Sequence, residues 1–280
     1  MSFIDAVLLG LSAAWDRVHE SFSSSPVGSP VTCCALEAPP RKTVSAKAQA
    51  RLSAAQEAMA YAKEKLPHGA GNQVTALQAT NLNSFYRAQV SRDKSAFNIP
   101  AKVVDLAHKN PVAFAAAKAE LAQGGNCGEH ARLAYDYLRR KYPGEHIQLS
   151  QKEGLDHAFV LIGDPVKEGA AEVVVADAWP TKATPVLWED HFAYEPDAAK
   201  ILNQASSQGD GRDYKQEMLD AGLSLNAKGK ADVQKSLTEV QTSEQLNRAS
   251  ELHLWNHQDT AAKDRSYQYV SPGASGGGVR

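Results

Sequence analysis

Apolar residues recur every three or four positions through most of the first half of the chain, which is the spacing of amphipathic helices. Within residues 1–22 the spacing predicts a helix with one apolar face, made of Ile4, Leu8, Leu11 and Trp15. A second helix is predicted from Ser45, a suitable N-cap, through an Ala-rich run that stops between Pro67 and Gly69. We expect further helices over about 74–90, 100–109, 111–122 and from Cys127 to the "KYPGEH" turn.

The pattern changes after residue 145, where short apolar runs between turn residues predict strands. The three runs are "HIQLS", which alternates, and the nearly continuous "HAFVLIG" and "AEVVVADAW". Beyond them, the pattern predicts helices around 196–206 and 230–254. Helices followed by a short antiparallel sheet make the expected fold class α+β.

Changes in composition divide the chain into four parts. Residues 1–45 are rich in Ser and Pro from residue 21 onward, and we interpret them as a disordered secretion or targeting segment. Residues 46–195 form the expected core with its helical prefix, and residues 196–270 form a C-terminal helical extension. Residues 271–280 are expected to be a flexible tail.

The charge balance gives no sign of a polyanionic partner. With 30 Lys and Arg against 32 Asp and Glu, the net charge of −2 predicts neither nucleic-acid nor membrane binding. No apolar run is long enough to be a transmembrane segment. The apolar N-terminus lacks the positive charge of a secretory signal. Three cysteines cannot form a disulfide framework, so reduced thiols are expected.

Three polar residues stand at the ends of predicted elements. Cys127 begins a helix, where the helix dipole favours a thiolate. His157 begins one strand and Asp177 ends the next, so antiparallel pairing would bring them together. A thiolate nucleophile, an imidazole that moves protons and a carboxylate that orients the imidazole are the parts of a cysteine catalytic triad.

Neighbouring residues complete the predicted site. Asp156 also lies beside His157 in sequence, but adjacent strand residues point to opposite faces, which favours Asp177. The backbone N–H of Cys127 and a side-chain amide of Gln123 or Asn126 are candidate oxyanion donors. Trp179 is a core aromatic in one interpretation and a wall of the site in another.

Two further features of this stretch concern substrate access and metals. The glycine pair before Asn126 is expected to let a substrate backbone approach.

Cys127-Gly128-Glu129 matches the first half of a zinc deaminase motif, which needs a later cysteine pair. No cysteine follows residue 127, so we expect neither a metal site nor a cofactor.

The segment from 123 to 181 resembles the transglutaminase-like branch of papain-fold cysteine enzymes. The resemblance is carried by "GGNCGEHARLAYDYLRR", "DHAFVLIG" and "VVVADAW", in that order. It implies a papain-like core in which the cysteine helix packs on a short antiparallel sheet, with extra helices on both sides. It also implies catalytic roles for Cys127, His157 and Asp177.

The layout of the whole chain resembles bacterial type III secreted effectors. This resemblance implies virulence-related secretion without a cleavable signal, a secretion chaperone at the N-terminus and a protein substrate in a host cytosol. Without secretion, the expected location is the cytoplasm. The stretch "GSPVTCC" would fit myristoylation of Gly28 and palmitoylation of Cys33 and Cys34 after cleavage at Val27, although a chance match is the simpler interpretation.

The predicted function is thiol-dependent acyl transfer on protein amides, as a glutamine deamidase or transglutaminase. The alternatives are a cysteine protease with the same triad and a non-enzymatic papain-like binding module. Acidic Glu129 and the lack of a tryptophan near Cys127 depart from secreted papain-type proteases, and this counts against general proteolysis.

Overall fold

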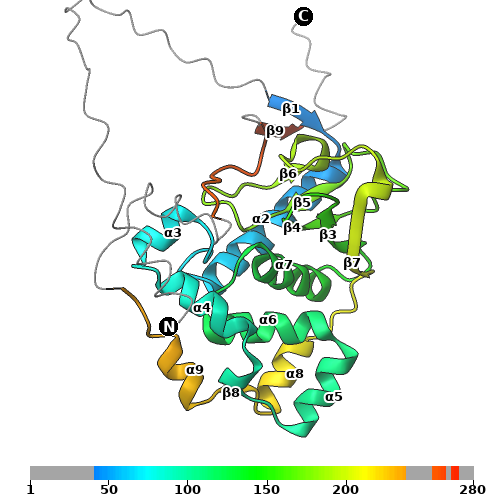
Figure 1. Ribbon diagram of the computed structural model, residues 1–280. Helices are drawn as coiled ribbons and strands as arrows, with labels where there is room; N and C mark the ends of the chain where they lie inside the picture. The colour runs from blue at the N-terminus through cyan, green and yellow to red at the C-terminus, as the bar shows by residue number, and fades with distance from the viewer. Residues whose placement is uncertain (1–40, 238–253, 263–265, 271–280) are drawn as a thin grey trace, which may run out of the picture.

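The computed structural model describes residues 41–237, 254–262 and 266–270 (Figure 1). The predicted N-terminal helix, the lipidation site at Gly28, Cys33 and Cys34, and the tail 271–280 lie outside the described residues. The described chain is a mixture of helices and mainly antiparallel strands, which confirms the α+β class.

A five-stranded antiparallel sheet forms the centre of the fold, in the strand order β6-β5-β4-β3-β7. The strands are β3 (Ile147–Lys152), β4 (Ala158–Ile162), β5 (Val174–Ala176), β6 (Val186–Leu187) and β7 (Ile201–Ser207). Every residue of β4 is buried, because apolar layers cover both faces of the sheet. This double burial explains the continuous apolar run in the sequence of β4.

Two long helices, α2 (Ala46–Lys65) and α7 (Cys127–Lys141), cover one face of the sheet (Figure 1). Alternate strand residues such as Leu149, Val160 and Val174 meet them in one apolar cluster. Phe159, Trp188 and their neighbours cover the opposite face, where the described part of the chain has no helix of comparable length. The helix that carries Cys127 is therefore held directly against the sheet.

A second helical layer lies beyond α7 and has its own apolar cluster (Figure 1). Its helices are α4 (Asn83–Arg92), α5 (Ala101–Lys109), α6 (Pro111–Ala122), α8 (Tyr214–Asp220) and α9 (Ala227–Asp232). The smaller elements are α3 (Val74–Ala79), 3₁₀ turns at Lys94–Ala96, Trp188–Asp190 and Ala198–Lys200, the pair β2 (Phe97–Asn98) with β8 (Ser224–Leu225), and the pair β1 (Arg41–Val44) with β9 (Ser266–Tyr269).

Most predicted helices have the expected bounds, because the residues that cap them lie next to the helix ends in the sequence. The Ser45 hydroxyl accepts the Ala48 N–H at 3.0 Å and begins α2. The Asn110 side chain accepts the Ala113 N–H at 3.0 Å, with Pro111 in the first turn of α6. None of the described helices combines the length and apolarity needed to cross a membrane.

Four expectations about elements are wrong. The single helix predicted over 74–90 is two helices, because Asn81 and Leu82 have positive φ angles of 48° and 65°. The helix predicted at 196–206 is instead strand β7, an edge strand paired with β3. The helix expected from residue 230 ends at Asp232, and residues 238–253 lie outside the description. Residues 41–44, assigned to a disordered segment, form β1 and pair with β9.

Candidate active site

Cys127 is the first residue of α7, and a carboxylate on the same helix stabilises this start. Glu129 accepts the backbone N–H of Asn126 at 2.7 Å, as in a capping box. Arg92 of α4 binds the same carboxylate twice, at 3.1 and 2.8 Å. Glu129 is 7% exposed, and despite this burial Arg92 keeps its pKa below the ordinary value. An ion pair between a buried carboxylate and an exposed guanidinium thus fixes the helix end that presents the half-buried thiol.

His157 directly precedes β4 and Asp177 directly follows β5, and these two strands are antiparallel neighbours, as the sequence pattern predicts. Val160 of β4 pairs with Ala176 of β5, so the beginning of one strand lies beside the end of the other. His157 Nε2 is 2.7 Å from Asp177 Oδ2, and each side chain is 1% exposed. The antiparallel register therefore produces the imidazole–carboxylate pair.

The Asp177 carboxylate has hydrogen-bond partners at both oxygens. Oδ1 accepts the backbone N–H of Trp179 at 3.1 Å. Oδ2 contacts His157 and also His191, whose Nε2 lies 3.2 Å away. His191 Nδ1 accepts the Ala193 N–H at 3.2 Å, so the proton of this imidazole is at Nε2 and points to the carboxylate.

These contacts hold Asp177 in its charged form. Burial raises the pKa of a carboxyl group, but His157 and His191 outweigh burial and hold the pKa of Asp177 well below its usual range. Burial likewise opposes charge on His157, yet Asp177, together with Cys127, raises the pKa of His157 to about 10. Burial lowers the pKa of His191, which keeps that ring neutral. The site thus combines an imidazolium, a carboxylate and a neutral second imidazole.

The remaining nitrogen of His157, Nδ1, is the one available to Cys127. Nδ1 is buried, and no described group completes a hydrogen bond to it. Asp177 and, to a smaller extent, the thiol of Cys127 raise the pKa of His157 against the effect of burial. Catalytic hydrogen bonds are often long before a substrate binds, so this geometry suits proton exchange between sulfur and Nδ1.

The other predicted site residues lie as follows. Trp179 packs against the His157 ring with centroids 4.7 Å apart, so it is both a core aromatic and a wall of the site. Asn126 stands directly before Cys127. Gln123 is the exposed C-cap of α6, and its side-chain oxygen lies 3.4 Å from Arg87 Nη1. Gln123 is therefore engaged with α4 in this structure.

Internal packing explains the glycine pair before Asn126. A Cβ atom at Gly124 would stand 2.3 Å from the Cβ atom of Arg87, and one at Gly125 would stand 2.1 Å from that of Glu129. These glycines therefore make room for α4 and for the capping carboxylate. Their surroundings do not support the expectation that they admit a substrate backbone.

His191 is the site residue that the sequence analysis missed. It follows a 3₁₀ turn in "WEDHFAYE" and belongs to no motif that distinguishes it from a surface histidine. Its complete burial beside Asp177 becomes evident only in three dimensions.

His157, Asp177 and His191 also form a group that could hold a metal ion, since their ligand atoms lie within 4.8 Å of one another. In this structure, hydrogen bonds connect both histidines to one oxygen of Asp177. That arrangement suits proton positioning, because a shared carboxylate orients both rings through their Nε2 atoms.

Comparisons with models of known protein families, with curated proteins and with solved structures found no match for this chain. The interpretation of the site therefore depends on its geometry. A thiol at a helix start, an imidazole whose pKa it raises and a buried carboxylate behind that imidazole can together perform nucleophilic acyl transfer.

Proposed function

We propose that the protein is a cysteine-dependent acyl-transfer enzyme with a papain-like core that acts on protein amides. The observation that supports this function best is the Asp177–His157 hydrogen bond of 2.7 Å, with His157 Nδ1 left free beside Cys127. Asp177 orients the ring through Nε2, so Nδ1 can exchange a proton with the thiol of Cys127.

The reaction begins when the Cys127 thiolate attacks the carbonyl carbon of a side-chain amide. The imidazolium of His157 donates its Nδ1 proton to the leaving nitrogen, which departs as ammonia and leaves a thioester on Cys127. Neutral His157 then removes a proton from water or an amine, which attacks the thioester. The products are a carboxylic acid or a new amide and the regenerated thiol.

The backbone N–H of Cys127 is positioned to stabilise the oxyanion that forms in each step. It lies in the first turn of α7, where the helix supplies no acceptor for an N–H group. The backbone N–H of Asn126 is already bonded to Glu129, so the backbone donors come from Cys127 onward, and the side-chain amide of Asn126 stays a candidate donor.

We favour deamidation or transglutamination of glutamine over peptide cleavage. The acidic residue two positions after the nucleophile is bound to Arg92 and closes the helix start with an ion pair, unlike the first turn of papain-type proteases. A host protein is the proposed substrate, and a bacterial effector is the proposed context.

The test is alkylation of Cys127 by iodoacetamide as a function of pH, followed by intact mass, in wild type and in His157→Ala. We expect rapid alkylation at pH 6 that depends on His157, because the imidazolium stabilises the thiolate. A slow reaction at pH 6 that is unchanged in His157→Ala would refute the catalytic pair.

Glutamine-containing peptides then distinguish the reactions. Deamidation changes the peptide mass without cleavage, addition of an amine requires a supplied primary amine, and proteolysis produces two fragments. Cys127→Ala is the control, and activity that persists in this variant would assign the reaction to another group.

A further inference from the structure

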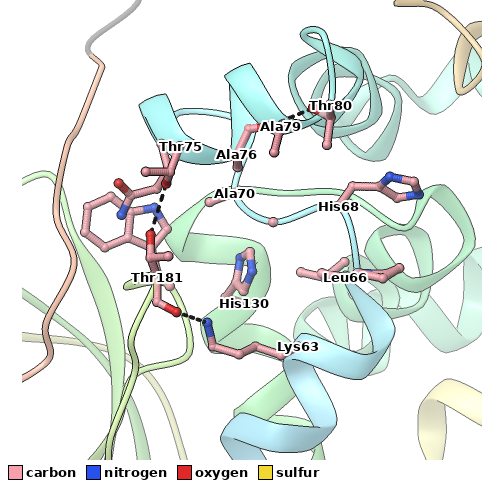
Figure 2. A pocket seen from close by; sticks show the side chains of 14 residues that line it. Lys63, Leu66, His68, Ala70, Thr75, Ala76, Ala79, Thr80, His130 and Thr181 are labelled. Carbon is pink, nitrogen blue, oxygen red and sulfur yellow. Dashed lines mark hydrogen bonds between the residues drawn. The ribbon is translucent and has the colours of Figure 1, made fainter. Parts of the chain in front are cut away.

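A pocket of about 360 Å³ lies between the end of α2, α3 and the segment after β5 (Figure 2). Its size is within the range of small-molecule sites. His130 and Trp179 line it, whereas Cys127, His157 and Asp177 do not. The pocket is therefore a separate space behind the wall that Trp179 forms for the triad.

His130 provides an unused hydrogen-bond acceptor in this pocket. Its side chain is buried, and Nδ1 lies 2.8 Å from the carbonyl oxygen of Asn126, so Nδ1 carries the proton. Burial lowers the pKa of His130 to about 4, which leaves Nε2 as an unprotonated acceptor. No described residue donates to Nε2, and the ring stands among the lining side chains (Figure 2). The pocket thus offers an acceptor to a ligand with an O–H or N–H group.

Lys63 provides positive charge at the rim of the pocket. Its ammonium group donates to the carbonyl oxygen of Thr181 at 3.2 Å (Figure 2) and to that of Pro180 at 2.8 Å. One of its three N–H groups remains. Burial lowers the pKa of Lys63, and the carboxylate of Asp177, which does not line the pocket, opposes this effect and favours the charged form. The lining contains no Asp or Glu, whereas it contains Lys63 and two histidines. This charge distribution favours an anion over a cation.

The remaining lining is largely apolar and would contact the body of the ligand. It includes Leu66, Ala70, Ala76 and the indole of Trp179. We propose that this pocket binds a small organic acid whose body is apolar and which carries an O–H or N–H donor. The carboxylate pairs with Lys63, the donor bonds to His130 Nε2, and the body packs on Trp179. This site does not depend on the proposed acyl-transfer function.

The test uses four probes of one shape with the full chain in isothermal titration calorimetry. The probes are 4-hydroxyphenylacetate, its neutral amide, the cation tyramine, and phenylacetate, which lacks the hydroxyl donor. We expect 4-hydroxyphenylacetate to bind best, and the amide and phenylacetate each to bind about tenfold more weakly, the effect of losing one charge-assisted or buried hydrogen bond. Tyramine is expected not to bind.

Two variants locate the binding. Lys63→Met removes the charge, and we expect about tenfold weaker binding of 4-hydroxyphenylacetate. Ala76→Leu fills the pocket without touching the Lys63 hydrogen bonds, and we expect binding to be lost. Lys65→Met and Ala60→Leu are the matched controls, because they make the same two kinds of substitution at residues of α2 that do not line the pocket. The affinity for 4-hydroxyphenylacetate should be unchanged in both. Circular dichroism confirms that each variant is folded.

Three results would overturn the proposal. They are the absence of saturable binding for all four probes, tyramine binding as tightly as 4-hydroxyphenylacetate, and wild-type affinity in a folded Ala76→Leu variant. Equal affinity for phenylacetate and 4-hydroxyphenylacetate would refute the role of His130. The probe series on the wild-type protein decides the charge preference even if Lys63→Met fails to fold.

Discussion

His191 donates a hydrogen bond to Asp177, with 3.2 Å between Nε2 and Oδ2. The same oxygen contacts His157 at 2.7 Å, so one carboxylate oxygen connects a neutral imidazole and a charged one. Among the described side chains, His191 hydrogen-bonds only that of Asp177, so it acts on the site through this carboxylate. We therefore regard it as a positioning residue, which keeps the carboxylate charged and directed at His157.

Replacing His191 with Phe is expected to slow Cys127 alkylation at neutral pH by roughly three- to tenfold. The variant loses one hydrogen-bond donor to the Asp177 carboxylate. The free energy of about one hydrogen bond corresponds to a change of this size. His191→Gln can still donate from its amide and should recover most of the rate. The measurement is the pH profile of alkylation, followed by intact mass.

His257→Phe is the matched control for His191. His257 packs on the same aromatic group, with its ring 4.1 Å from Phe192, but it makes no hydrogen bond to Asp177. The alkylation profile of this variant should match wild type. If the Gln and Phe variants of His191 lose the same rate, its role is only to fill space.

The pKa of His157 predicts how stability depends on pH. Its value is raised from 6.5 to about 10 by Asp177 and Cys127, against the effect of burial. A group with a raised pKa in the folded state contributes stability that is complete below pH 6.5 and is lost as the pH rises toward 10. The free energy of unfolding should therefore fall over this range because of this residue.

Asp177→Asn tests that dependence, because it removes the charge that raises the His157 pKa. Urea unfolding at several pH values should give a steeper decline above pH 6.5 for wild type than for Asp177→Asn. Parallel curves for the two proteins would show that the imidazolium–carboxylate pair contributes no pH-dependent stability.

The sequence pattern predicted the elements that carry Cys127, His157 and Asp177 because each has a strong local signal. The start of α7 has a Gly-Gly-Asn approach and a capping carboxylate. Strands β4 and β5 are continuous apolar runs, since both faces of the sheet are covered. Adjacent runs of this kind pair as neighbours, which is why the position of His157 beside Asp177 could be anticipated from strand order.

Features that depend on distant contacts were not predictable in this way. Strand β7 is mostly exposed and polar, with only Ile201 buried, and its extended form follows from pairing with β3. The break at Leu82 requires a left-handed residue that helix propensity does not indicate. The burial of His191 depends on how the segment after β6 folds against Asp177. The hydrophobic pattern of the local sequence therefore indicates none of these three features.

The ion pair between Arg92 and Glu129 should matter more than its surface position suggests. Removing Arg92 leaves a nearly buried carboxylate without its bidentate partner, so Arg92→Met should cost about 1–3 kcal/mol of unfolding free energy. Arg132→Met is the control, since its guanidinium is 3.9 Å from Glu129 and should cost less than about 1 kcal/mol. Urea unfolding of both variants gives the comparison, and equal losses would contradict the capping role of the Arg92 pair.

The close packing of α4 on Gly124 gives the last prediction. A methyl group there would stand 2.3 Å from Arg87 Cβ and 2.7 Å from the Arg87 carbonyl carbon, so the backbone of α4 would have to move. Gly124→Ala is therefore expected to lower the free energy of unfolding by about 1–3 kcal/mol, a typical cost of overpacking. Gly169→Ala is the control, because no atom lies within 4 Å of its added Cβ, and its stability should stay near that of wild type. If Gly124→Ala instead keeps full stability and loses only reactivity toward substrates, the glycine serves substrate access and not the packing of α4.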